Sequence, residues 1–505
     1  MANYNYVDAD GNFKVPDWIL IDKGKVKYNH TVFADKIVDM FCVVALPTAK
    51  NTLLYFYVDE LGIYKKCYEI DVTGNIQSYI RKLINDFNTI RDEPEKEREE
   101  ILKYCPVDFD TASNLMVNET DINKTYKAIF RSENIRTLKS LDEFNRNENC
   151  IVFKNGVLNL KTMQLMPHSP TYMSTIQIPV EWNTNCNIEP KVFTEYINHL
   201  ANYDADQKQS LLEAIGLAIS NINVGQRCKK SLFLKGDGNC GKSVFLMMLE
   251  QLIGTDNYVS MPWSRLKERF ALADLFGKRI AADPDCQAYG ENDVSQFKLI
   301  SSADILTAEN KYEPSFTFQY RGIYIVCTNI LPDFSGDTGK WVYDRMLIVQ
   351  CGDEIPVEKR NKRLLTDLLQ ESESIVFLAV QALKQLIERD YRMTVSEASK
   401  QLVSNYVINN NIYLSFIEEC CMPIDKLNKN SDEVVTAKDM WVAVQRYVED
   451  AIGRKANRRA FEAALRNKYN ITDAQDVKAS TGKKRYYKYI TLKPEYVEEY
   501  LQNEE

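Results

Sequence analysis

One glycine-rich run has the residue types and spacing of a phosphate-binding loop: Gly236, Asp237, Gly238, Asn239, Cys240, Gly241, Lys242 and Ser243. It matches Gly-x4-Gly-Lys-Ser/Thr, in which glycines let the backbone curl so that amide N–H groups face phosphates. Apolar residues 232–234 predict a strand before it and residues 244–252 predict a helix after it, which is the context this motif requires. We therefore expect the run to bind ATP, with Lys242 on the β- and γ-phosphates and Ser243 on Mg2+. A glycine turn with an incidental lysine is the alternative.

Polar residues at the ends of two later predicted strands could complete such a site. The strand at residues 278–282 ends at Asp283 and Asp285, where one carboxylate could hold Mg2+ and the other could polarise the attacking water. The proline between them leaves open which carboxylate has which role. The strand at residues 323–327 leads to Asn329, which could bond the γ-phosphate and the attacking water at the carboxyl edge of a sheet. An acidic turn and a turn asparagine are the alternatives.

Arg345 lies directly before a further predicted strand, residues 346–349. A guanidinium at this place could reach the nucleotide of a neighbouring subunit and stabilise charge during phosphoryl transfer, as an arginine finger does. An ion pair on the protein surface accounts for a single arginine equally well. Arg345 is therefore a candidate catalytic residue of a site that includes a second copy of the chain.

Alternating strand-like and helical segments must position these residues. From about residue 190 to 354 the pattern begins with helices and then alternates strands and helices, which is typical of a parallel sheet covered on both faces. Before it, short strand-like runs alternate with helices such as residues 75–90, whose apolar residues fall on one face. We expect an α/β protein with five segments: an α+β N-terminal domain at 1–181, a helical collar or linker at 182–226, an ATPase core at 227–356, a helical segment at 357–410 and a winged-helix-like module at 411–505.

The last segment concentrates basic residues on a predicted helix and hairpin. Thr436 begins a helix that closes near Gly453, and a second helix follows Asn457. A hairpin is expected over residues 477–490, with basic residues at its tip. This combination is typical of a winged helix, which lays its second helix in a DNA groove, although a solubilising basic tail or a protein-docking module is the alternative. The candidate DNA-binding residues are Arg458, Arg459, Lys483, Lys484 and Arg485.

Composition and charge exclude several other classes of protein. The 12 cysteines are scattered without a Cys-x-x-Cys pair and the 3 histidines lie far apart, so zinc, redox and histidine-based sites are not expected. No apolar run approaches the roughly 20 residues of a membrane helix, and the polar start lacks a secretory signal, so we expect a cytoplasmic protein with no membrane contact. The net charge of -8 argues against coating duplex DNA but allows a motor whose basic groups line a channel.

Taken in order, these segments resemble superfamily 3 helicases, in particular the helicase portion of satellite-phage, plasmid and poxvirus primase-helicases. The likeness runs from about Cys150 to Pro356. Besides the glycine-rich run and the acidic strand end, the matching parts are residues 153–160, 167–170, 297–300, 304–312, 316–318, 327–332 and Arg345. The resemblance implies an AAA+-like P-loop core and a homo-oligomeric ring, expected to be a hexamer, that acts in the replication of a phage, plasmid or other mobile genetic element.

In the resembled family a hairpin in the central channel grips DNA, and Lys311 and Tyr312 stand at the matching place. A cation can track phosphates while an aromatic ring stacks on a base, so both are candidate DNA-binding residues, with an ordinary loop lysine as the alternative. The chain departs from the family in two ways. The family often has paired arginines where this chain has Asp344 and Arg345, and the N-terminal segment shows no metal-binding carboxylate set, so primer synthesis is not inferred.

These features predict an ATP-dependent DNA helicase that translocates as a ring on single-stranded DNA, with replication-origin DNA and host replication proteins as further partners. One alternative is a nucleotide-regulated origin-binding initiator or scaffold with little motor activity, which stimulation of ATP hydrolysis by single-stranded DNA would distinguish. Another is a GTPase, because residues 274–277 mimic Asp-x-x-Gly and residues 310–313 nearly mimic Asn-Lys-x-Asp. Neither run follows a predicted buried strand, so the GTPase alternative is disfavoured.

Overall fold

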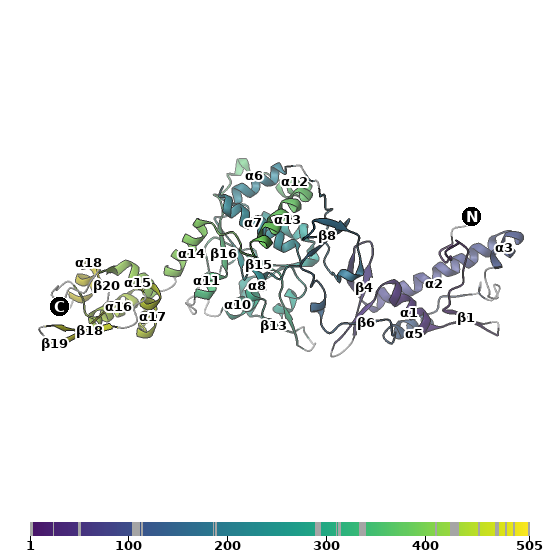
Figure 1. The fold of residues 1–505 in the computed structure, drawn as a ribbon, viewed down its shortest axis with the longest axis horizontal. Helices are drawn as coiled ribbons and strands as arrows, with labels where there is room; N and C mark the ends of the chain where they lie inside the picture. Colours follow the sequence, from purple (N-terminus) through teal and green to yellow (C-terminus); the bar gives the residue numbers. More distant parts are fainter. Residues whose placement is uncertain are drawn as a thin grey trace.

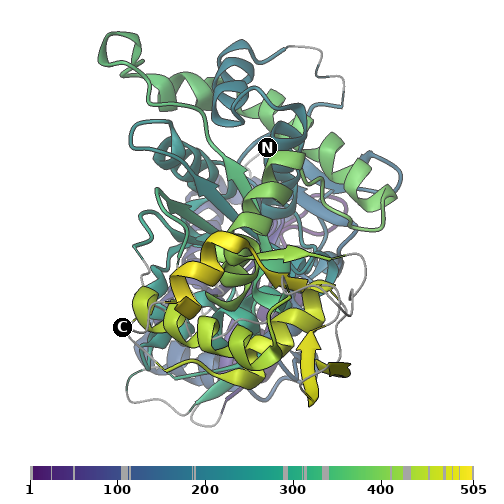
Figure 2. The ribbon, with the colours of Figure 1, turned by 90° about the vertical axis from the view of Figure 1, so that its left-hand side faces the viewer.

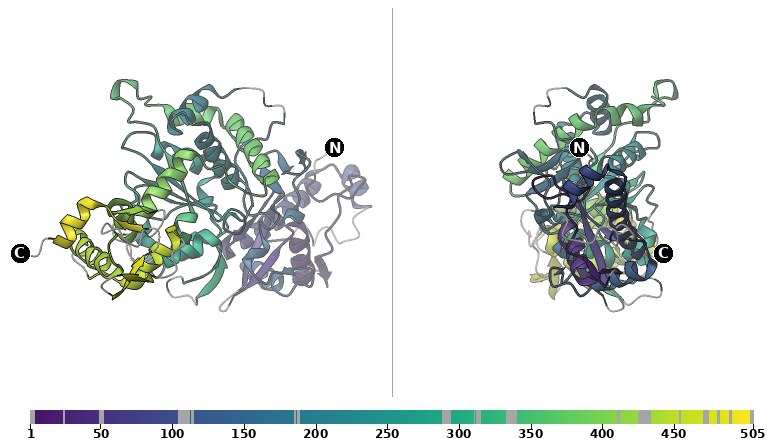
Figure 3. Two further views of the ribbon diagram at one scale, coloured as in Figure 1. Left: turned by 60° about the vertical axis from the view of Figure 1, so that its left-hand side comes forward. Right: turned by 90° about the vertical axis from the view of Figure 1, so that its right-hand side faces the viewer.

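The elements of the computed structural model are arranged in a row (Figure 1). The N-terminal elements lie at one end, a parallel sheet with its covering helices lies in the middle, and the C-terminal elements lie at the other end, as Figure 3 also shows. The two chain termini are therefore at opposite ends of the molecule. The residues that the structure describes are 4–23, 25–48, 52–103, 112, 115–184, 186, 189–287, 294–309, 311, 315–332, 340–409, 412–424, 434–452, 455–469, 474–479, 482–487 and 490–502.

A four-stranded sheet in the order β5-β4-β3-β6 lies among the N-terminal elements. Its strands are β3 (Val44–Pro47), β4 (Thr52–Val58), β5 (Ile63–Cys67) and β6 (Arg136–Thr137). The other elements here are the paired strands β1 (Ile19–Asp22) and β2 (Lys25–Tyr28) and the helices α1 (His30–Met40), α2 (Glu69–Asp92), α3 (Glu95–Leu102) and α5 (Glu119–Ile129). The apolar face predicted over residues 75–90 is confirmed as the buried face of α2, where Ile76, Ile80 and Leu83 are fully buried.

A small antiparallel sheet and a group of helices lead to the middle of the molecule. The sheet contains β7 (Cys150–Phe153), β8 (Gly156–Asn159) and β9 (Gln164–Met166). The helices are α6 (Lys191–Leu200), α7 (Ala205–Ile219), α8 (Val224–Arg227), α12 (Leu364–Gln370) and α13 (Ser372–Glu388). Gly216 lets α7 and α13 approach closely, because a Cβ on it would lie 2.6 Å from the Ala379 carbonyl oxygen. On the same helix the fully buried Glu213 accepts hydrogen bonds from the Arg389 guanidinium and, at 2.9 Å, from the Thr394 N–H.

The sheet in the middle has five strands in the order β11-β12-β15-β10-β16, and every neighbouring pair is parallel. The strands are β10 (Ser231–Lys235), β11 (Tyr258–Ser260), β12 (Ile280–Asp283), β15 (Ile323–Thr328) and β16 (Met346–Gln350). The connections include α9 (Lys242–Ile253), α10 (Ser295–Ser302) and α11 (Lys340–Asp344). The prediction of an α/β protein with a parallel sheet is confirmed.

Both faces of this sheet are buried, which explains why its strands read as continuous apolar runs. In β10, Leu232 and Leu234 belong to one hydrophobic core while Phe233, which points to the opposite face, belongs to another. Ala281 and Ala282 of β12 divide between the two cores in the same way. Small side chains at these positions let the neighbouring helices pack close to the sheet.

The antiparallel hairpin of β13 (Ile305–Ala308) and β14 (Phe316–Gln319) extends from the middle of the molecule (Figure 1). A chain segment, α14 (Glu397–Asn409), leads from the parallel sheet to the C-terminal elements. These elements face the viewer in Figure 2, and they are α15 (Ile412–Cys420), β17 (Cys421–Pro423), α16 (Ala437–Ile452), α17 (Arg458–Tyr469), β18 (Ala474–Ala479), β19 (Gly482–Tyr487), β20 (Ile490–Leu492) and α18 (Pro494–Val497).

The two helices and the hairpin predicted for the C-terminal segment are present, but the basic residues of the hairpin lie elsewhere than expected. Strands β18 and β19 pair as an antiparallel hairpin in which Lys483, Lys484 and Arg485 belong to β19. They lie opposite residues 476–478 in the ladder rather than at the tip, because the strands extend to within two residues of each other. Among the described residues no helix is both long and apolar enough to span a membrane.

Candidate functional site

The glycine-rich run lies between the end of β10 and the start of α9, at the carboxyl edge of the parallel sheet. Helix α9 begins at Lys242, and Gly241 precedes it with a φ of 107°, a backbone conformation that L side chains rarely adopt. The Tyr196 hydroxyl on α6 donates a hydrogen bond to the Gly241 carbonyl at 3.0 Å, and a Cβ on Gly241 would lie 3.1 Å from the same tyrosine ring. Glycine is therefore required here both for the turn and for the contact.

The start of the run is held just as closely. The Gly236 N–H donates to the Thr328 carbonyl at 3.1 Å, which continues the pairing of β10 with β15. A Cβ on Gly236 would lie 2.7 Å from the Cβ of Cys351, so only glycine fits. Gly238 differs from the other two glycines, because nothing lies within 4 Å of the place its Cβ would take.

Lys242 joins two parts of the predicted site. Its ammonium donates hydrogen bonds to the Gly236 carbonyl at 2.5 Å, the Asp237 carbonyl at 2.7 Å and the Asn329 side-chain oxygen at 3.1 Å. The side chain is buried, whereas Asp237, Gly238 and Asn239 are exposed around it, as is the Ser243 side chain on the first turn of α9. The structure thus brings Lys242, Ser243 and Asn329 together, from two strand ends, around an open loop.

Residues after β16 brace the outer side of the loop. The Asn239 side-chain amide donates to Glu354 at 3.0 Å, the Ile355 N–H donates to the Asn239 carbonyl at 3.2 Å, and Arg360 pairs with Glu354 at 2.7 Å. Asn239 has a φ of 60°, which asparagine tolerates better than most residues. Sequence reasoning missed this brace and Tyr196, because a contact between distant segments leaves no local pattern.

The two aspartates at the end of β12 have different surroundings. Asp283 is only 2% exposed, and its carboxylate accepts hydrogen bonds from the backbone N–H of Trp263 at 2.7 Å and of Asp285 at 3.2 Å. Burial raises the pKa of the Asp283 carboxyl above its ordinary value. Asp285 is exposed and accepts a hydrogen bond from Gln287 at 3.0 Å. Asp283 therefore holds backbone in place, whereas Asp285 can reach a ligand.

The oxygen groups at this edge suit a hard divalent cation. The Ser243 hydroxyl and the Asp285 carboxylate are both exposed, and Mg2+ prefers one or two such protein oxygens together with water and phosphate. Among the residues that the structure describes, no group of three or more His, Cys, Asp or Glu side chains could hold a metal ion by itself.

Arg345 lies at the opposite edge of the sheet. It stands before β16, and its carbonyl accepts a hydrogen bond from the Ser231 N–H at the start of β10. Its guanidinium donates to the Ser302 hydroxyl on α10, with distances of 2.8 and 3.2 Å. The glycine-rich run follows the other end of β10, and five residues of strand span roughly 16 Å. Arg345 therefore does not join the site of its own chain.

The predicted DNA-binding residues lie in two other places. Lys311 is exposed between β13 and β14, whereas Tyr312 lies outside the described residues. An ion pair at 3.0 Å joins Glu309, which follows β13, to Arg269. On α17, Arg459 is exposed and Arg458 pairs with Glu462 at 3.0 Å. Lys483 and Lys484 belong to β19, and Arg485, which follows them on the same strand, is exposed.

The residues that mimic a GTPase motif are otherwise engaged. Asp274 forms an ion pair with Arg265 at 2.9 Å and lies within the 3-10 helix Ala271–Leu275 rather than after a buried strand. Asn310 and residues 312–313 of the second mimic lie outside the described residues. The geometry at Asp274 is therefore unlike that of a nucleotide-sensing loop.

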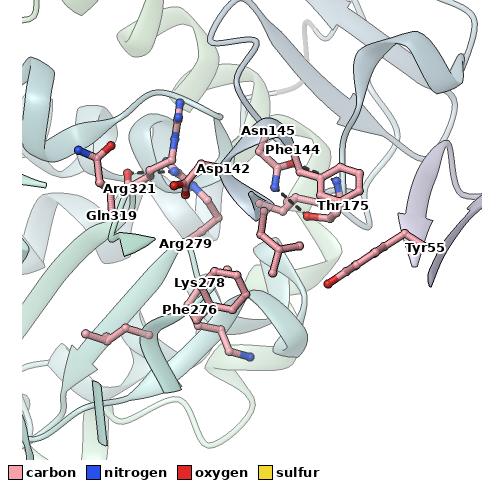
Figure 4. Close-up of a pocket in the computed structure, with 14 residues that line it drawn as sticks. Tyr55, Asp142, Phe144, Asn145, Thr175, Phe276, Lys278, Arg279, Gln319 and Arg321 are labelled. Carbon is pink, nitrogen blue, oxygen red and sulfur yellow. Dashed lines mark hydrogen bonds between the residues drawn. The ribbon is translucent and has the colours of Figure 1, made fainter. Parts of the chain in front are cut away.

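A cavity of about 180 Å3 lies away from the glycine-rich run, and none of the predicted site residues lines it (Figure 4). Its wall combines N-terminal residues such as Asp142 with residues that precede β12 and β15, such as Arg279 and Arg321. Arg279 is buried and donates to the carbonyls of Leu217 at 2.8 Å and Ile222 at 3.0 Å. Its guanidinium therefore ties the sheet to the end of α7.

Comparison with known proteins finds two matching families. Residues 35–200 match the family described as D5 N terminal like, and residues 234–345 match a family of unknown function, DUF5906. Putative helicase 121R of Invertebrate iridescent virus 3 is 23% identical over 412 residues, which cover 71% of this chain and 42% of that protein. The chain thus spans less than half the length of this relative.

Comparison with solved structures matches two structures of the C-terminal region of NrS-1. One, the A form apo structure, has a TM-score of 0.47 and 11% identity, and the match covers 90% of this chain and 99% of that chain. The other, the apo structure of residues 305–718, has the same TM-score and identity, with coverage of 92% and 100%.

Proposed function

Because its two matched regions and its viral relative bear out the likeness to phage and viral primase-helicases, we propose that this protein is an ATP-dependent DNA helicase. One observation carries the proposal. Lys242, on the first turn of α9, contacts Asn329 from the neighbouring strand end beside an open glycine-rich loop. Ligands of open α/β sheets bind at this carboxyl edge, and a helix N-terminus with exposed N–H groups favours phosphate.

The loop and Lys242 bind the nucleotide phosphates in this proposal. The N–H groups of residues 237–243 donate to phosphate oxygens, and the Lys242 ammonium neutralises the β- and γ-phosphates. Asn329 already bonds this ammonium at 3.1 Å, so it lies where it can orient a water against the γ-phosphate. Because Asn329 directly follows β15, hydrolysis of the γ-phosphate changes the contacts of Asn329 at the end of this strand.

Ser243 and Asp285 are the residues that would hold Mg2+, which, when bound, supplies positive charge that offsets the phosphates. Their exposed oxygens support this assignment, and we propose Asp285 rather than Asp283 as the magnesium ligand. Asp283 acts as a positioning residue, since it accepts a hydrogen bond from the Asp285 N–H of the same turn and another from the Trp263 N–H of an upstream segment.

The motor is proposed to work as a ring of identical subunits, with a hexamer as the expected number. Arg345, at the sheet edge opposite the loop, acts in the site of the neighbouring subunit, and a head-to-tail arrangement of this kind closes into a ring. Lys311 on the β13–β14 hairpin contacts single-stranded DNA in the channel. The five segments expected from the sequence, including a C-terminal winged helix for duplex origin DNA, are the domain division that we propose.

ATP hydrolysis by the purified chain tests this function directly. We expect hydrolysis that single-stranded DNA stimulates, and a loss of roughly a hundred-fold or more in turnover in the Lys242→Ala variant, because no other group in the loop neutralises the phosphates. Lys235→Ala is the matched control: this lysine lies just before the loop, but its ammonium bonds Gln350 at 3.1 Å. Unchanged turnover of Lys242→Ala at saturating ATP would refute the site.

The same assay separates the alternatives. Hydrolysis that single-stranded DNA leaves unchanged would favour the origin-binding scaffold, and a preference for GTP over ATP would favour the GTPase.

A further inference from the structure

Two cysteines lie close together beside Gly236 of the glycine-rich loop. Cys240 belongs to the loop itself, and Cys351 directly follows β16, the edge strand beside β10. A Cβ on Gly236 would lie 2.7 Å from the Cβ of Cys351 and 3.2 Å from the sulfur of Cys240. Both cysteines therefore lie on the same side of Gly236 and within reach of each other, and both are free thiols.

The backbone fixes both residues of this pair. The Cys351 N–H donates to the Lys235 carbonyl at 2.7 Å, so Cys351 is pinned to the strand end from which the loop starts. Cys240 is followed by Gly241, whose carbonyl is held by Tyr196 at 3.0 Å. The pair is thus a fixed contact between the loop and the sheet edge.

Charge around the pair activates one of its sulfurs. The Cys351 thiol has the Cys240 sulfur and the Val349 carbonyl, at 3.9 Å, as acceptors, and the Lys242 ammonium lies 3.7 Å from the Cys240 sulfur. The hydrogen bond from Cys351, followed by the charge of Lys242, lowers the pKa of the Cys240 thiol, while the same hydrogen bond raises that of Cys351. Cys240 is therefore the nucleophile of the pair and Cys351 its proton-bearing partner.

We propose that Cys240 and Cys351 form a reversible disulfide that closes the phosphate-binding loop to nucleotide. The inference rests on the proposed function of the loop and adds a means of regulating it. It assigns the two cysteines as a redox modification site, with a peroxide as the oxidant and a low-molecular-weight thiol as the reductant.

The oxidation balances in two steps. The Cys240 thiolate attacks one oxygen of hydrogen peroxide, the O–O bond breaks, and hydroxide leaves and takes up a proton to become water. The Cys351 sulfur then attacks the Cys240 sulfenic acid, so that the S–S bond forms, the S–O bond breaks and a second hydroxide leaves with the Cys351 proton as water. Two thiols thus lose two electrons and two protons to one peroxide, and two equivalents of a thiol reductant reverse the change.

The disulfide would alter the loop in two ways. It fixes the sulfurs about 2.05 Å apart, closer than a thiol hydrogen bond holds them, and so draws Cys240 toward the sheet edge and away from the curve that presents N–H groups to phosphates. It also removes the thiolate beside Lys242 and so changes how the ammonium is held. A displacement of about 1 Å in such a site costs on the order of a hundred-fold.

The test uses the full-length chain, hydrogen peroxide and a fluorescent ATP analogue. We expect peptide mapping to find Cys240 linked to Cys351 after oxidation, nucleotide affinity to fall roughly ten- to hundred-fold, and a thiol reductant to restore both. In Cys351→Ser, which keeps a hydrogen-bond donor but cannot form the bond, peroxide can oxidise Cys240 only as far as its own oxyacids, so no cross-link forms and the loss of affinity should be smaller than in the unchanged protein. Cys327→Ala is the matched control, because Cys327 is another buried thiol on β15, and this variant should respond to peroxide as the unchanged protein does.

The outcomes separate the two proposals. A reduced protein that binds no nucleotide contradicts the proposed function. In that case the peptide map alone shows whether the disulfide forms. A reduced protein that binds nucleotide but yields no Cys240–Cys351 link, or yields the link with unchanged affinity, overturns the inference. Equal sensitivity of Cys351→Ser and the unchanged protein also overturns it, since the loss of affinity would then not depend on the cross-link.

Discussion

Asp283 and Asp285 are both aspartates at the end of β12, but they differ in burial and therefore in role. Both carboxylate oxygens of Asp283 accept hydrogen bonds from backbone N–H groups inside the protein, whereas Asp285 is exposed on the same turn. A buried donor that loses its acceptor costs about 1–3 kcal/mol, because it has given up its hydrogen bonds to water. A surface carboxylate carries no such cost, so its replacement affects only what it binds.

Replacing the two aspartates one at a time should therefore separate stability from catalysis. Asp283→Ala should lower the free energy of unfolding by about 1–3 kcal/mol, since the Trp263 N–H loses its acceptor. Asp285→Ala should change stability by no more than roughly 0.5 kcal/mol but raise the Mg2+ concentration needed for half-maximal ATP hydrolysis. Urea unfolding and a magnesium titration of turnover measure the two effects. An Asp285→Ala protein with an unchanged magnesium requirement would contradict the proposed metal role.

At the residue level, the sequence predicted those contacts of the site that follow from a local sequence pattern. Lys242 and Asn329 are in contact as expected, because the loop after β10 and the residue after β15 both lie at the carboxyl edge of the parallel sheet. Tyr196 was not predicted, although it holds Gly241 at 3.0 Å, because it lies on a helix far upstream and only the packing of α6 places it there.

At the scale of elements, the buried strands were the most predictable part of the fold. Strands β10, β12, β15 and β16 coincide with the apolar runs of the sequence, since a strand buried on both faces has no polar alternation. Their order in the sheet could not be predicted, because it depends on which helix packs on which face. The short strand β11 and the 3-10 segments around Trp263 were missed, since only tertiary contacts hold such short elements.

The C-terminal elements have a hydrophobic core of their own. Its buried residues, from Phe416 to Tyr500, all come from α15 and the elements after it. Removing this part should therefore leave the parallel sheet and its covering helices intact. The basic residues expected to contact duplex DNA would be lost with it, including Arg458, Arg459 and Arg485.

Truncation after residue 411 should accordingly leave ATP hydrolysis stimulated by single-stranded DNA but weaken binding to duplex origin DNA. The measurement is the affinity for origin and scrambled duplexes at one fixed salt concentration, because phosphate contacts make affinity strongly salt-dependent. The untruncated variant Arg459→Ala, which removes one exposed charge without removing the core, should weaken duplex binding less than the truncation does. Equal affinities before and after truncation would show that this part does not read DNA.

At the scale of the whole molecule, basic residues gather where the parallel strands begin. Lys230 precedes β10, Arg279 precedes β12 and Arg345 precedes β16. The first two are occupied within the chain: Lys230 donates to the Asp344 carbonyl at 2.6 Å, and Arg279 donates to backbone carbonyls. Arg345 donates to the Ser302 hydroxyl at 2.8 Å. This edge is opposite the nucleotide loop, so in the proposed ring the site that Arg345 serves belongs to a second subunit.

Mixing two inactive variants tests this sharing of the site between subunits. Arg345→Ala should bind nucleotide normally but lose roughly a thousand-fold in turnover, which is the usual worth of an arginine finger supplied in trans. Lys242→Ala should be inactive through its own loop. In a mixed ring, activity should return wherever an intact Arg345 faces an intact Lys242, a pairing that neither homogeneous ring contains. Fluorescence transfer between labelled subunits confirms exchange, and exchange without recovered activity would show that Arg345 acts only within its own chain, as a surface ion pair does.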